Sequence, residues 1–234
     1  MRIMTFNTQH CQNFKTKEID FDVMAKTILE CGADLVGLNE MRGQGTDPEY
    51  TPQTERLAAL TGMQYYHFSM AFDVPGKGPY GNGLLSKYAI VRAETIAIPM
   101  PAREDRIKGK YYEPRCIIKA ELENGVTVLI SHFGLNPDEQ ALAVEAAMEH
   151  IKDEKCILMG DFNVKPDKPV LLPIRERMVD AACLLDAEVC SFPSDLPHQK
   201  IDYIFLSKDM RLVSAAIPPI VSSDHRPHLA EMEI

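Results

Sequence analysis

The stretch "CILMGDFNV" (Cys156–Val164) sets an apolar run directly before glycine, aspartate and asparagine. The run Cys156–Met159 predicts a short buried strand, because an apolar run bounded by turn-forming residues is typical of one. Asp161 and Asn163 follow it, and both residue types are common in turns. On their own the two polar side chains therefore predict only a turn. They gain meaning if other strands in the chain end in the same way.

Helical patterns separate several further apolar runs. Apolar residues recur at helical spacing through Asp20–Gly32, and again through Thr51–Gly62, where Thr51 or Thr54 would cap the helix. The clearest helix begins after Pro137 and carries two acids in its first turn, where the helix dipole favours negative charge. Residues 123–125 predict a hairpin turn. The remaining runs predict strands at 2–6, 35–38, 64–72, 81–98, 116–122, 126–133, 156–160, 200–207, 210–217 and 226–234.

The order of these elements predicts an α/β sandwich of three or four layers, with mostly antiparallel sheets inside and helices outside. The chain has 234 residues and contains no repeat, low-complexity tract or linker. We therefore expect a single domain spanning residues 1–234.

Composition excludes several classes of protein. No apolar run approaches the roughly 20 residues of a membrane span, and the beginning of the chain turns polar at Asn7, unlike a signal peptide, so we expect a cytoplasmic protein. The six cysteines form no CxxC pair and several lie in apolar runs, which predicts free thiols in the core. The net charge of −9 argues against tight nonspecific binding to a polyanion. It does not exclude a phosphate substrate, because carboxylates that hold a divalent cation present positive charge.

Polar side chains stand at the ends of many predicted strands. Each has an ordinary explanation as a turn former, a solvated strand end or a rim histidine. Together they indicate a site, because burying carboxylates beside strands is costly unless they are paired or bind metal. These residues are Asn7, Glu40, Asn82, His132, Asp161, Asn163, Asp202, Asp224 and His225.

Seven motifs carry a resemblance to a known family. In chain order they are "MTFNTQ", "GLNEM", "YGNGLLS", "SHFGLN", "GDFNV", "IDYIF" and "SDHRPH", and they span Asn7 to His228. The series resembles that of the endonuclease/exonuclease/phosphatase superfamily, the deoxyribonuclease-I-like metal-dependent hydrolases. The resemblance implies a four-layer α/β sandwich and hydrolysis of a phosphate ester with Mg²⁺ or Mn²⁺.

The resemblance also implies a role for most of the polar residues. Glu40 matches the principal metal ligand, and Asn7 and Asp224 match residues that complete the metal site. All-oxygen ligation of this kind suits Mg²⁺ or Mn²⁺ better than zinc. Asp161 and Asn163 match the pair that orients the attacking water and the phosphate.

Three further matches concern proton transfer and phosphate binding. His225 matches the active-site histidine, and Asp202 matches the carboxylate that fixes its tautomer. The sequence leaves open whether His225 or Asp161 is the general base. His132 matches a position that contacts the phosphate or assists the leaving group.

Three residues are expected to face the substrate: Asn82, Tyr80 and Arg115. Tyr80 would either line the pocket or merely pack. Arg115 begins a strand, where it would either bind a phosphate bidentately or remain on the surface. Lys200 is expected to be solvated. The segment 99–115 carries basic residues interleaved with tyrosines, which would either hold a polyanion or form a solvated basic loop.

The leading hypothesis is a Mg²⁺-dependent phosphodiester hydrolase acting on a phosphate ester, with no membrane span and no inferable protein partner. Nucleic acid is one substrate class to test, which makes a nuclease the first alternative. A phosphomonoesterase acting on a sugar, inositol or lipid headgroup is the second. A catalytically inactive binding module is disfavoured, because a competent residue fills every expected catalytic position.

Overall fold

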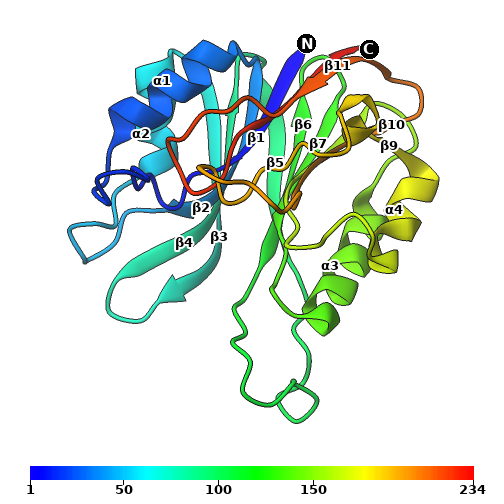
Figure 1. Ribbon diagram of the computed structural model, residues 1–234. Helices are drawn as coiled ribbons and strands as arrows, with labels where there is room; N and C mark the ends of the chain where they lie inside the picture. Colours follow the sequence, from blue (N-terminus) through cyan, green and yellow to red (C-terminus); the bar gives the residue numbers. More distant parts are fainter.

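The apolar runs form two six-stranded sheets that face each other, with helices on the outer faces (Figure 1). A computed structural model describes residues 1–234. The first sheet has the strand order β11-β12-β1-β2-β4-β3 and the second β5-β6-β7-β8-β10-β9. This arrangement confirms the predicted four-layer α/β sandwich.

Most predicted strands appear close to their expected positions. The first sheet contains β1 (Arg2–Asn7), β2 (Leu35–Arg42), β3 (Tyr65–Val74), β4 (Gly78–Ser86), β11 (Arg211–Ala216) and β12 (His228–Glu233). The second contains β5 (Ile90–Ala97), β6 (Cys116–Leu122), β7 (Thr127–His132), β8 (Cys156–Asp161), β9 (Met178–Asp180) and β10 (Asp202–Ser207). The predicted hairpin turn joins β6 to β7, which pair in antiparallel fashion.

Helices α1 (Phe21–Cys31) and α2 (Gln53–Thr61) cover the first sheet, and α3 (Pro137–His150) and α4 (Leu172–Arg177) cover the second (Figure 1). Short 3-10 helices η1 (Pro169–Leu171) and η2 (Ala181–Leu184) complete the elements. The side chain of Asp20 caps α1, and Gly32 ends it with φ 63°. No helix is long and apolar enough to cross a membrane.

The predicted cap of α2 is wrong. The helix begins at Gln53, Pro52 occupies the N-cap position, and no side chain bonds the first turn. Thr54 is buried inside the helix, and its hydroxyl has no partner. The Gln53 side chain instead accepts from the Arg42 N–H and donates to the His10 carbonyl, so α2 is tied to neighbouring loops by an amide.

Three hydrophobic clusters fill the three spaces between the layers. Alternation along each strand sends one residue to the space between the sheets and the next toward the helices. In β1, Ile3 joins the cluster between the sheets and Met4 the cluster beneath α1 and α2. In β8, Ile157 joins the central cluster and Leu158 the cluster beneath α3 and α4. All six cysteines are free, and four are buried.

Two parallel strand pairs set the position of the polar residues. β1 pairs with β2, and β7 with β8; the crossovers run through α1 and α3. The register places Asn7 opposite Asn39, and His132 opposite Asp161. β10 pairs antiparallel to β8 and places Asp202 opposite Asp161. Residues far apart in sequence therefore meet at one end of the two sheets.

The glycine before Asp161 is required by this pairing. Gly160 has φ 149°, and a Cβ there would lie 1.7 Å from the Ser131 carbonyl oxygen on β7. Any larger residue would push β7 and β8 apart. The glycine of "GDFNV" thus allows Asp161 to end β8 beside His132.

Candidate active site

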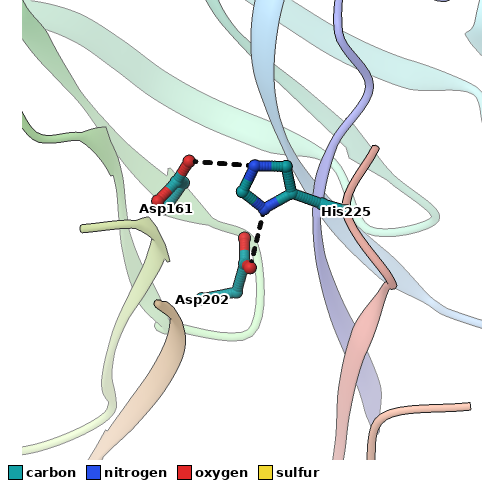
Figure 2. Close-up of side chains that lie close together, drawn as sticks. All are labelled: Asp161, Asp202 and His225. Atoms are coloured by element: carbon teal, nitrogen blue, oxygen red, sulfur yellow. Dashed lines mark hydrogen bonds and ion pairs between the residues drawn. The ribbon is translucent and has the colours of Figure 1, made fainter. Parts of the chain in front are cut away.

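His225 lies between two buried carboxylates (Figure 2). Its Nδ1 is 2.9 Å from Asp202 Oδ2, and its Nε2 is 3.5 Å from Asp161 Oδ2. The Phe192 ring packs on the imidazole, with centroids 4.7 Å apart. Burial lowers the pKa of His225, but Asp202 and Asp161 outweigh burial and raise that pKa to about 10. The imidazole is therefore charged at neutral pH.

Asp161 is the carboxylate on which the site converges. Its Oδ2 accepts from Asn7 Nδ2 at 3.1 Å, and its Oδ1 accepts from the Asn163 N–H at 2.9 Å. Burial raises its pKa to about 7; the His225 charge opposes this shift and the Asp202 charge adds to it. A carboxylate with a pKa near neutrality is suited to exchange a proton with water.

Asp161, Asp202 and His225 present ligand atoms within 4.8 Å of one another, a spacing that a metal ion could share. The chemistry of the trio favours an acid–base relay instead. A charged imidazole has a proton on each nitrogen and no lone pair to offer a cation. Both protons face carboxylates here, so the three groups already satisfy each other.

Glu40 provides a better centre for a divalent ion. Its Oε1 accepts from Asn7 Nδ2 at 3.1 Å. Burial raises its pKa, and the nearby negative charge of Asp224 adds to that shift. Two carboxylates that repel each other are hard oxygen ligands of the kind that Mg²⁺ or Mn²⁺ takes. The Asn7 amide turns its nitrogen to Glu40, and its Oδ1 accepts from the Gln9 N–H. Glu40 and Asp224 therefore suit a divalent ion, and the place of Asn7 in the metal site stays a prediction.

A second group of side chains surrounds His132 and includes Asn163 and Arg115. Asn163 Nδ2 donates to the Phe133 carbonyl at 3.1 Å and lies 3.2 Å from His132 Nε2. Arg115 Nη1 lies 2.7 Å from His132 Nδ1 and 3.1 Å from Glu113 Oε1. Burial, Arg115 and His225 lower the pKa of His132 well below its usual value, so His132 is neutral.

Tyr80 and Asn82 come from the same strand and differ in position. Burial and then the Glu40 charge raise the pKa of the Tyr80 hydroxyl well above the usual value. Asn82 is 2% exposed; its Nδ2 donates to the Cys116 carbonyl, and its Oδ1 accepts from Asn39. The prediction that Asn82 contacts substrate is therefore corrected: its amide is engaged inside the protein.

Asn39 is a supporting residue that the sequence did not reveal. Its Nδ2 donates to Asn82 Oδ1 at 2.9 Å and to the Ser131 carbonyl at 3.1 Å, and its Oδ1 accepts from the Asp161 N–H at 2.9 Å. One fully buried amide therefore joins β2 and β4 of the first sheet to β7 and β8 of the second. It stands next to Glu40 in "GLNEM", but nothing in the sequence distinguishes it from a turn asparagine.

Two other side chains depart from expectation. His10 Nδ1 lies 3.9 Å from Glu40 Oε2, and burial, with Arg42 nearby, lowers its pKa to about 4; no sequence signal marks it. Lys200 is 7% exposed and not solvated as predicted. Its ammonium lies 3.6 Å from the centre of the Tyr203 ring and has no hydrogen-bond partner.

Solved structures with the same fold include proteins of different activities. An endonuclease/exonuclease/phosphatase from Beutenbergia cavernae superposes with a TM-score of 0.79 at 18% identity, covering 100% of this chain and 71% of that one. A mannosyl-6-phosphatase from Bacteroides thetaiotaomicron gives 0.77 at 15% identity, with 100% of both chains covered. A 3'-5' exonuclease from Neisseria meningitidis gives 0.69 at 18%, again with 100% of both chains covered. At these identities the likeness shows the fold alone.

Comparison of sequences gives the family. No curated protein matches the chain. The model of the Endonuclease/Exonuclease/phosphatase family matches residues 4–225, nearly the whole chain, and confirms the resemblance carried by the seven motifs. The chain therefore belongs to the endonuclease/exonuclease/phosphatase family, whose members hydrolyse phosphate esters.

Proposed function

We propose that the protein is a Mg²⁺- or Mn²⁺-dependent phosphoesterase that hydrolyses a phosphodiester by attack of an activated water. The observation that carries the proposal is His225, held charged between Asp202 and Asp161 beside the carboxylate of Glu40. Such an arrangement combines a cation for phosphate oxygens with a base for water. The site draws on both sheets, which supports a single catalytic domain over residues 1–234.

Each residue has a role in this proposal. A divalent ion bound by Glu40, Asn7 and Asp224 would neutralise charge developing on the phosphate. Asp161 accepts the proton of the attacking water, because its pKa is raised to about 7. His225 offers positive charge to the phosphate, and Asp202 stabilises that charge and orients the ring.

The side chains around His132, together with Tyr80, complete the proposed site. Asn163 Nδ2 lies 3.2 Å from His132 Nε2, which faces Asp161 Oδ2, and both nitrogen atoms would contact the phosphate. Tyr80 lies beside Glu40, where its hydroxyl would line the pocket. These groups would hold the phosphate while Asp161 and His225 act on it.

The test is hydrolysis of bis-p-nitrophenyl phosphate beside p-nitrophenyl phosphate with Mg²⁺, Mn²⁺ or EDTA. We expect metal-dependent turnover of the diester that Glu40→Gln abolishes. Glu30→Gln is the matched control, since Glu30 is exposed on α1, where its carboxylate pairs with Lys26. A preference for the monoester would overturn the diester assignment. Absence of Mg²⁺ and Mn²⁺ binding in calorimetry would overturn the metal site.

A nuclease is the second candidate, favoured by one observation. A hollow of about 370 Å³ adjoins Asn163 and is lined by Lys165, Lys168, Gln140 and Gln199 among its residues. Lysines next to a hydrolytic centre suit a substrate with a second phosphate. Cleavage of a single-stranded oligonucleotide with a steep salt dependence, reduced in Lys165→Gln, would support this candidate.

A further inference from the structure

The two ring nitrogens of His132 face different groups. On one side, Arg115 Nη1 lies 2.7 Å from Nδ1. On the other, Nε2 lies 3.5 Å from Asp161 Oδ2 and 3.2 Å from Asn163 Nδ2. The residue is 4% exposed, so both nitrogens are largely shielded from bulk water, and Nε2 is the one that faces Asp161.

A guanidinium group only donates hydrogen bonds and stays charged at every pH a protein tolerates. At 2.7 Å, Nδ1 of His132 must therefore accept from Arg115 and carry a lone pair. A neutral imidazole has one proton, which leaves it on Nε2. The Nε2–H then points toward Asp161 and the site.

The Asn163 amide is oriented independently. Its Nδ2 faces the Phe133 carbonyl at 3.1 Å, and the reversed amide would place two oxygens in contact. Asn163 Nδ2 and His132 Nε2 are thus both donors, and their 3.2 Å contact is not a hydrogen bond between them. Asp161 Oδ2, the carboxylate oxygen that faces His132 Nε2, is 3.5 Å away. Two donors side by side therefore suit one shared oxygen atom at a shorter distance.

We propose that Arg115 is a positioning residue that locks His132 in the Nε2–H tautomer, so that His132 and Asn163 together donate to one phosphate oxygen. In this proposal Arg115 acts through His132, because its Nη1 lies 2.7 Å from His132 Nδ1 and 3.1 Å from Glu113 Oε1. The neighbouring guanidinium also opposes protonation of His132, which keeps the ring neutral beside the charged His225. The catalytic part of this role rests on the proposed function; the tautomer does not.

Nuclear magnetic resonance tests the tautomer without any substrate. Long-range ¹H–¹⁵N correlation of histidine-labelled protein at pH 7 in EDTA distinguishes the two neutral tautomers and the imidazolium, and the loss of one set of signals in His132→Phe assigns the residue. We expect wild-type His132 as the Nε2–H tautomer. Arg115→Lys should retain it, because an ammonium also only donates, whereas Arg115→Met should give averaged or exchanged signals. An Nδ1–H ring or an imidazolium in the wild type would overturn the proposal, whatever the activity.

Kinetics on bis-p-nitrophenyl phosphate test the consequence. His132→Phe should lower kcat about 100-fold, as loss of one transition-state donor does, and Arg115→Met about tenfold with KM little changed, as for loss of a residue that orients another. The double variant should be no slower than His132→Phe. Additive losses, or a rise in KM with kcat unchanged, would show that Arg115 binds the phosphate directly and overturn its positioning role. Arg103→Met, an exposed cation of the same loop, is the matched control.

Discussion

Replacing Asn39 by leucine should show how much the hydrogen bonds of this buried amide stabilise the junction between the two sheets. Leucine is close to asparagine in shape, so little cavity forms, but the Asp161 N–H, the Ser131 carbonyl and Asn82 Oδ1 lose their partner. Asn39 is 0% exposed, and water cannot replace it. Each buried group left without a partner costs about 1–3 kcal/mol.

Three such groups give a loss of about 3 kcal/mol at the lower bound and about 9 kcal/mol at the upper bound. Since the total stability of a domain is about 5–15 kcal/mol, a loss near the lower bound leaves the variant folded, and it should unfold at clearly lower urea concentration. The measurement is urea unfolding followed by far-ultraviolet circular dichroism, because the chain has no tryptophan to report by fluorescence.

A matched control is Asn124→Leu in the hairpin turn, where the side chain accepts one bond, from the Val126 N–H at 3.2 Å. That change should cost about 1 kcal/mol, the net worth of one ordinary hydrogen bond. If Asn39→Leu lost no more than Asn124→Leu at an unchanged denaturant slope, the bridge between the sheets would not be coupled through this amide and the reasoning would be refuted.

Three further predictions concern charged groups. The folded-state pKa of His225, about 10, lies above its ordinary value of 6.5, so the stability from its charge is fully present below pH 6.5 and is lost as pH rises through 10. In EDTA, the free energy of unfolding should therefore fall over that window in the wild type and much less in Asp202→Asn. Equal pH dependence of the two proteins in urea titrations would contradict this. Glu40→Gln should raise the melting temperature in EDTA, because burial opposes the Glu40 charge, and it should remove any stabilisation by Mn²⁺. Calorimetric scans with and without Mn²⁺ check both effects, and a variant that Mn²⁺ still stabilises would exclude Glu40 as a ligand. Lys200→Met should leave the free energy of unfolding unchanged or raise it by about 1 kcal/mol, because an apolar side chain of similar length replaces a buried ammonium without a hydrogen-bond partner. A clear fall in the urea midpoint would show that the contact with the Tyr203 ring stabilises the protein by more than the burial of the charge costs.

The sequence predicted the elements well because their signals are local. The helix over Phe21–Cys31 has its periodicity and its terminal glycine in a single stretch, and both appear in the structure; the cap by Asp20 was not predicted. The cap of α2 was missed because Gln53 takes tertiary partners in place of a local threonine bond. Helix α4, of six residues, is too short to show a period.

The site was less predictable because its geometry depends on register. The hydrophobic pattern shows which face of a strand is buried, but not which residue of a neighbouring strand stands opposite. Asn7 meets Asn39, and His132 meets Asp161, only through pairing of strands that helices separate in sequence. Lys200 was misplaced for a similar reason: a lysine is exposed by default, and only the packing against Tyr203 buries it.

A bulge in β2 at Glu40 explains how Asn39 supports the junction between the sheets while its neighbour Glu40 faces the site. Regular alternation would send Asn39 and Glu40 to opposite faces of β2, away from a common site. The pairing of β2 with β4 shifts register between Leu38 and Met41, and Glu40 has φ 62°. A bulge of this kind re-aims a side chain at about 1–3 kcal/mol of backbone strain.

Asn163 has the same left-handed conformation, with φ 52°, directly after β8. One such residue thus follows the buried part of each central strand, and each directs a polar group toward Asn7 or His132. Buried amides bond both strained residues: Asn7 donates to the Glu40 carboxylate at 3.1 Å, and Gln140 donates to the Asn163 carbonyl at 2.9 Å. Side chains from neighbouring elements therefore offset the backbone strain that aims these two polar groups.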